Sequence, residues 1–258
     1  MRFVTMIGVL AVGLGTSLAL LGCSQSSGEG GGGVPTTGAT STGNTTTGTT
    51  EPVTDQPEPF PQGTGQNPNP TIEYPKGPFG VNKGSVIQNF KFMGFPNSLE
   101  NNKDLVTVQM ADFYNPTGKG VFGKGASFPE GQAKPKAILI DVSSVWCGPC
   151  NYEAANVLPG LYAKYKPRGG EFLLQLADGP TPGSAANSKH LYNWTKKYKV
   201  DYPATIDPSY KLSALFQADA FPANMIIDTK TMKIVDVIAG VAEEGGTFWK
   251  AYEKLLDN

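Results

Sequence analysis

The stretch that decides the fold runs from Ile138 to Cys150 and reads ILIDVSSVWCGPC. Together with the preceding Ala137, its first half is an apolar run interrupted only by Asp141, which is typical of a buried strand. Its second half places Pro149 at an early helical position, where a residue without an N–H is tolerated. The stretch therefore predicts a strand that leads directly into a helix, with Cys147 at the junction.

The position of Cys147 at a helix N-terminus predicts a reactive thiol. Unpaired N–H groups and the positive end of the helix dipole stabilise a thiolate, so we expect a lowered pKa and a nucleophilic Cys147. Cys150 lies one turn further along, less exposed and close enough for a disulfide. The spacing alone also allows half of a zinc site or a purely structural bridge. A zinc site is disfavoured because the chain has only one further cysteine and a single histidine, His190.

The run from Ile138 to Cys150 resembles the active-site strand and turn of thioredoxin, which ends in the same five residues. The resemblance implies a thioredoxin-like α/β fold, disulfide exchange through Cys147 and Cys150, and no cofactor or metal. Asp141 stands six positions before Cys147, like the family's buried acid, which helps to move the proton of the inner cysteine. A buried carboxyl would have a raised pKa and could act as a general base; a partly exposed acid at a strand end is the alternative.

Five further residues are implied to form the contact surface for a substrate. Phe221 and Pro222 resemble the family's cis-proline loop, which packs against the disulfide and pairs with the substrate backbone. Gly148 and Pro149 lie between the cysteines. Trp146 stands beside the reactive cysteine, where it can shield the disulfide and offer a flat apolar contact.

The rest of the domain alternates between strand and helix patterns, which indicates crossovers and a largely parallel sheet centre. Helices are predicted over Asn151–Tyr165, Ser188–Val200, Ser209–Gln217 and Thr247–Leu256, and strands over Ser85–Phe95, Leu105–Tyr114, Glu171–Ala177, Asn224–Asp228 and Lys233–Ala239. The two earliest strands are expected to extend one edge of a mixed central sheet flanked by helices.

The helical segment Ser188–Val200, inserted before the cis-proline loop, is similar to the insertion of membrane-anchored TlpA/ResA-like thioredoxins and of redoxins. Glu153 matches a position that is often acidic in the TlpA-like group. Gln175 is expected where thioredoxin has a lysine near the buried acid. Typical peroxiredoxins place a threonine shortly before a single reactive cysteine; Val142–Ser144 contain none, which disfavours a peroxidase.

Residues 1–22 have the layout of a secretory signal. Arg2 is followed by a run from Phe3 to Leu21 without an ionisable side chain. The final Leu20-Leu21-Gly22-Cys23 resembles the lipobox of bacterial lipoproteins, which implies that Cys23 is acylated and anchors the chain to a lipid membrane. Ser24 favours the outer membrane if the host is Gram-negative. A transmembrane helix and an ordinary signal with an incidental cysteine are the alternatives.

Residues 23–75 are predicted to be a disordered tether, and residues 76–258 a single domain. Gly28–Thr50 holds 8 Gly and 9 Thr in 23 residues, too little apolar surface to offset the backbone entropy of folding. The domain's length suits one hydrophobic core.

These features predict an extracytoplasmic, lipid-anchored thiol-disulfide oxidoreductase of the cell envelope. Its expected partners are protein disulfides and a membrane thiol electron donor, and the expected direction is reduction. A net charge of −1 argues against nucleic acid as a partner. A non-catalytic binding or assembly lipoprotein with a structural disulfide, and a redoxin-type antioxidant protein, are the alternatives.

Overall fold

The computed structural model describes residues 73–98, 104–210, 212 and 220–258. The predicted signal segment, the lipid attachment at Cys23 and the tether up to residue 72 lie outside the described residues. So does most of the helix predicted over Ser209–Gln217. None of the described helices is long and apolar enough to cross a bilayer.

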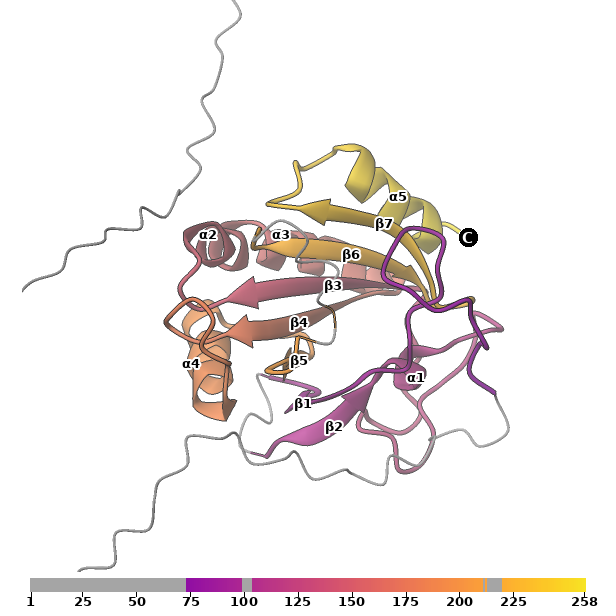
Figure 1. Ribbon diagram of the computed structural model, residues 1–258. Coiled ribbons are helices and arrows are strands. Elements are labelled where there is room, and N and C mark those ends of the chain that lie inside the picture. Colours follow the sequence, from indigo (N-terminus) through magenta and orange to yellow (C-terminus); the bar gives the residue numbers. More distant parts are fainter. Residues whose placement is uncertain (1–72, 99–103, 211, 213–219) are drawn as a thin grey trace, which may run out of the picture. The chain divides into compact units, whose positions relative to one another are not determined.

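A seven-stranded sheet with the order β2-β1-β5-β4-β3-β6-β7 forms the centre of the domain (Figure 1). At its centre, β3 (Ala137–Ser144) lies parallel to β4 (Gly170–Asp178), and β4 lies parallel to β5 (Ala204–Ile206). The strands β6 (Ala223–Asp228) and β7 (Lys233–Ala239) form an antiparallel hairpin, and β6 pairs antiparallel with β3. The prediction of a mixed sheet with a largely parallel centre is confirmed.

The strands β1 (Lys91–Phe95) and β2 (Val106–Gln109) extend the sheet beyond β5, as predicted for the N-terminal part of the domain, but β1 begins at Lys91 rather than at the predicted Ser85. β2 is shorter than predicted because the chain turns into the one-turn helix α1 (Met110–Phe113). Asp112 drives this turn: its carboxylate accepts from the Gln109 backbone N–H at 2.9 Å, a capping contact that favours helix over strand.

Four longer helices contribute side chains to one face of the sheet. They are α2 (Gly148–Asn156), α3 (Leu158–Tyr165), α4 (Ser188–Tyr198) and α5 (Thr247–Leu256), with a short 3-10 helix, Lys166–Arg168, after α3. Leu139 and Leu174 belong to the core on this face, whereas Ile138, Ile140 and Leu173 belong to a second core on the opposite face, with Phe113 of α1 among its members. Because β3 is buried on both faces, its sequence is continuously apolar rather than alternating.

The helix predicted over Asn151–Tyr165 is broken into two at Val157, which has φ −110° and ψ −60°. Pro159 explains the break, since it lacks the N–H that an unbroken helix would donate to the carbonyl of Ala155. The strand β5 was not predicted because its three residues are too few for a periodic pattern.

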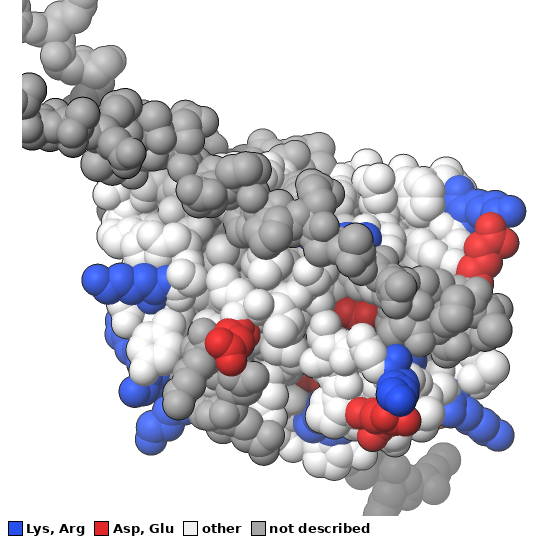
Figure 2. Space-filling view, turned by 90° about the horizontal axis from the view of Figure 1, so that it is seen from below, with Lys and Arg blue, Asp and Glu red and all other residues white. Residues whose placement is uncertain are grey.

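The surface shown in Figure 2 is mostly uncharged over the described residues, with Lys and Arg side chains spread along its margins.

Candidate active site

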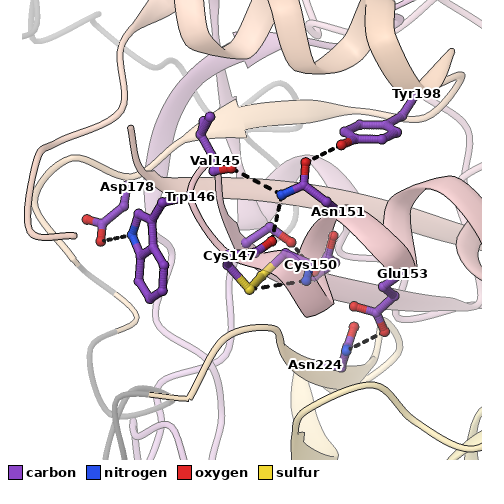
Figure 3. Close-up of a disulfide and its surroundings, with 11 residues drawn as sticks. Val145, Trp146, Cys147, Cys150, Asn151, Glu153, Asp178, Tyr198 and Asn224 are labelled. Atoms are coloured by element: carbon purple, nitrogen blue, oxygen red, sulfur yellow. Dashed lines mark hydrogen bonds between the residues drawn. A yellow bond between two sulfur atoms is a disulfide. The ribbon is translucent and has the colours of Figure 1, made fainter. Parts of the chain in front are cut away.

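A disulfide joins Cys147 and Cys150 at the junction of β3 and α2, with Cα atoms 5.3 Å apart (Figure 3). Cys147 is the N-cap of α2, and its Sγ accepts from the Cys150 backbone N–H at 3.1 Å. Pro149 lies in the first turn, where its missing N–H leaves no hydrogen bond unmade. The strand and helix predicted from the sequence thus meet at the two sulfur atoms.

The residues expected to contact a substrate lie in two adjacent loops. The Phe221–Pro222 peptide bond is cis, and the next residue, Ala223, pairs with Val142 of β3 close to the disulfide loop. The ring of Phe221 meets that of Trp146 edge-on, with centroids 5.8 Å apart. Trp146 is 39 % exposed, and Gly148 and Pro149 are also exposed, so an apolar surface borders the disulfide.

Asp178, which no local sequence pattern indicates, holds Trp146 in place. Its Oδ2 accepts from Trp146 Nε1 at 2.9 Å and from the Gly183 N–H at 3.0 Å, and its Oδ1 accepts from the Tyr210 hydroxyl. The available signal was topological, since Asp178 ends β4, and parallel neighbouring strands such as β3 and β4 end at the same edge of a sheet.

Asp141 is buried in the middle of β3, on the face that packs against the helices. Ser143 Oγ donates to its Oδ1 at 2.8 Å, and its Oδ2 has no hydrogen-bond partner among the described residues. Burial raises the pKa of Asp141 to about 7, against the opposing effect of the Ser143 hydrogen bond, which lowers it. The carboxyl therefore exchanges its proton near neutral pH.

Glu153 is a second buried carboxyl, one turn after Cys150 on α2. Asn224 Nδ2 donates to its Oε1 at 3.0 Å (Figure 3), and Asn224 is paired with Asp141 across the β3–β6 ladder. Burial raises the pKa of Glu153 to about 9, and the charge of Asp141 adds to the increase. The two carboxyls are electrostatically coupled, so the pair retains at least one proton at neutral pH. Glu153 was predicted only as an acidic position typical of the TlpA-like group, not as a catalytic residue.

The expectation that Gln175 lies near the buried acid is wrong. In the β3–β4 register Leu174 is opposite Asp141, and Gln175 is opposite Val142. Because side chains alternate along a strand, Gln175 points to the other face of the sheet. The residue opposite Asp141 is therefore the apolar Leu174. A basic group at that position would lower the pKa of Asp141.

His190 caps α4: its Nδ1 accepts from the Asn187 N–H at 3.3 Å. Within the described ranges, no group of three or more His, Cys, Asp or Glu residues could hold a metal ion.

The strand order around β3, the cis-proline at the start of β6 and the disulfide at the start of α2 together characterise the fold. The fold is thioredoxin-like. The helix α4, which lies between β4 and the cis-proline, is the insertion predicted for this thioredoxin-like domain.

No protein-family model matches the chain, and no curated protein does. Among solved structures, the chain is similar to the exposed lipoprotein thioredoxin of Streptococcus pneumoniae, with 22 % identity, a TM-score of 0.43, and coverage of 64 % of this chain and 99 % of that chain. It is also similar to a secreted thiol-disulfide isomerase of Corynebacterium glutamicum, with 13 % identity, a TM-score of 0.48, and coverage of 73 % and 95 %. A third match is the thioredoxin domain of a thiol-disulfide oxidoreductase of Bacteroides vulgatus, with 14 % identity, a TM-score of 0.45, and coverage of 68 % and 99 %. Identities this low say nothing about the substrate.

Proposed function

We propose that the protein is a thiol-disulfide oxidoreductase that exchanges disulfides with protein partners through Cys147 and Cys150. The observation that carries the proposal is the combination of this disulfide with two buried carboxyls, Asp141 and Glu153, whose pKa values are raised by burial. A purely structural disulfide needs no proton donor or acceptor nearby. Disulfide exchange does, because each thiol must lose a proton before it attacks.

In the first step, the Cys147 thiolate attacks one sulfur of the partner's disulfide. A bond forms between Cys147 Sγ and that sulfur, the partner's S–S bond breaks, and the second partner sulfur leaves as a thiolate that takes up a proton. The α2 N-terminus supports this step, because the Cys150 N–H that donates to Cys147 Sγ at 3.1 Å would also stabilise a thiolate there.

In the second step, Cys150 attacks Cys147 Sγ and releases the other partner sulfur as a thiolate, which takes up a proton and leaves as a thiol. Cys150 must first lose its proton, and we assign that proton to the carboxylate of Asp141, with Glu153 holding the other proton of the pair. Two electrons and two protons pass from the Cys147–Cys150 dithiol to the partner, and the Cys147–Cys150 disulfide remains. A pKa near 7 suits a group that accepts a proton at neutral pH.

We further propose that the protein acts in the reducing direction, outside the cytoplasm and anchored through an acylated Cys23. A membrane thiol carrier would then return two electrons to the disulfide after each cycle. Support for this part comes from the sequence of residues 1–24 and from the Gly148-Pro149 pair between the cysteines. Its test is a Cys23→Ser variant, which should lose lipid labelling and leave the membrane fraction.

The experiment on the reaction compares Cys150→Ser with Cys147→Ser, using a model protein that contains one accessible disulfide. Cys150→Ser should stop after the first step and accumulate a mixed disulfide through Cys147, visible by non-reducing electrophoresis and mass spectrometry. Cys147→Ser should form none or far less. Equal trapping by both variants, together with no turnover by the unaltered protein, would refute the proposal and favour a binding lipoprotein with a structural disulfide.

A further inference from the structure

Asn151, the residue after the disulfide, binds the backbone on both sides of Trp146. Its Nδ2 donates to the Cys147 carbonyl at 2.6 Å and to the Val145 carbonyl at 3.1 Å (Figure 3). These carbonyls belong to the turn between β3 and α2 that carries the reactive sulfur. The amide therefore links the end of the strand to the first turn of the helix.

The other end of the same amide is held by the insertion helix α4. Asn151 Oδ1 accepts from the Tyr198 hydroxyl and from Lys197 Nζ, the latter at 3.2 Å. Both residues lie 46 or more positions further along the chain. Tyr198 packs edge-on against Trp194, with ring centroids 4.7 Å apart, and Trp194 is buried. The last turn of α4 thus has a fixed position from which it reaches the disulfide turn through one side chain.

This chain of hydrogen bonds acts on the groups that stabilise a Cys147 thiolate. The turn held by Asn151 aims the Cys150 N–H at Cys147 Sγ. Donation to Asn151 Oδ1 polarises the amide and strengthens its donation to the Cys147 carbonyl, whose partial negative charge would otherwise oppose a nearby thiolate. The Lys197 ammonium donates to the same Oδ1 at 3.2 Å and adds to this polarisation of the amide.

We propose that Asn151 is a positioning residue, and that Tyr198 and Lys197 of α4 act through it to stabilise the Cys147 thiolate and raise the redox potential of the Cys147–Cys150 pair. The inference rests on the proposed function for its biological meaning. The pKa and the potential are nevertheless properties of the pair itself, so they are measured whether or not a partner disulfide is turned over.

The test is Tyr198→Phe, which removes one hydroxyl and keeps the ring against Trp194. The matched control is Tyr192→Phe on the same helix, whose ring lies against Lys196 Nζ at 5.3 Å. Two quantities are measured on the full chain: the pKa of Cys147, from the pH profile of its alkylation rate, and the equilibrium constant with glutathione.

Tyr198→Phe should raise the pKa of the Cys147 thiol. It should also shift the equilibrium constant with glutathione towards the Cys147–Cys150 disulfide by about three- to tenfold, which is the effect of about one net hydrogen bond. That shift corresponds to a potential lower by about 15 to 30 mV. Tyr192→Phe should leave both quantities unchanged. A merely structural role for Tyr198 would lower the melting temperature without moving the pKa or the equilibrium constant, and that result would overturn the proposal.

A double variant tests whether Tyr198 acts through Asn151. Asn151→Ala should shift both quantities in the same direction and by more than Tyr198→Phe, and adding Tyr198→Phe to it should change nothing further. Fully additive effects would overturn the proposal, because they would mean that the hydroxyl acts independently of the amide. If the unaltered protein fails to turn over a protein disulfide while these shifts are still observed, the proposed function fails and the coupling stands.

Discussion

Replacing Glu153 by Gln removes one buried titrating carboxyl and keeps the oxygen that accepts from Asn224 Nδ2. The raised pKa of Glu153 means that the folded protein holds this proton at pH values where the unfolded chain has released it. The free energy of unfolding should therefore fall as the pH rises from the ordinary glutamate pKa of 4.5 towards about 9. The amide introduced by Glu153→Gln has no such proton to lose, so the stability of the variant should depend less on pH.

The size of this pH dependence is set by the one proton that the folded protein holds on Glu153 and the unfolded chain does not. A difference of one bound proton changes the free energy of unfolding by about 1.4 kcal/mol per pH unit. Between about pH 5.5 and about pH 8, the variant should therefore gain up to about 3 kcal/mol relative to the unaltered protein. That is a large share of the roughly 5–15 kcal/mol by which a domain is stable.

Urea unfolding of the oxidised protein, followed by tryptophan fluorescence at several pH values, measures this slope. Glu253→Gln is the matched control, because the hydrogen bond from Lys164 lowers the pKa of Glu253. Stabilisation from a lowered pKa is fully present above the ordinary glutamate pKa. Glu253→Gln should therefore change the free energy of unfolding by the same amount at each of these pH values and leave its dependence on pH unchanged. If Glu153→Gln and the unaltered protein show parallel curves, Glu153 is not protonated in the folded state and the reasoning is refuted.

Three further predictions concern single contacts. Asp141→Asn should slow the second step of exchange about 10²- to 10⁴-fold near neutral pH, so that a mixed disulfide through Cys147 accumulates in stopped-flow or quench assays; an unchanged rate would exclude Asp141 as the base. Trp146→Phe removes the indole donor to Asp178 Oδ2, which keeps the Gly183 N–H as a donor, and should lower stability by about 0.5–1.5 kcal/mol in urea unfolding; no loss would mean that the contact contributes nothing. Tyr252→Phe removes a buried hydroxyl that donates to the Glu171 carbonyl at 2.9 Å, and should lower the melting temperature, with a cost of about 0.5–1.5 kcal/mol; an unchanged melting temperature would contradict it.

The unit from β3 into α2 was predictable because its signals are local. A continuous apolar run, a proline and two cysteines at a spacing of three lie within Ala137–Cys150, and each indicates structure over a few residues. The final helix, Thr247–Leu256, was likewise predicted with the bounds observed in the structure. The strands Lys233–Ala239 and Asn224–Asp228 were also predicted, the second one residue short of β6.

The contacts that position the candidate site could not be predicted, because their partners are distant in the chain. Trp146 and Asp178 are 32 residues apart, and Asn151 and Tyr198 are 47 apart. The sheet register and the packing of α4 bring these pairs together, and neither can be predicted from a pattern of neighbouring residues. The wrong prediction for Gln175 has the same cause, because the register of β4 against β3 is not evident from the sequence. An error of one residue in that register moves a side chain to the other face of the sheet.

The redox potential of the Cys147–Cys150 pair tests the central claim most directly. Equilibration of the full chain with glutathione or dithiothreitol mixtures, with the dithiol and disulfide forms counted by mass spectrometry after alkylation, gives this potential. For a pair that exchanges with protein disulfides, we expect a value above about −300 mV. A value far below about −300 mV, which is typical of structural disulfides, would contradict it.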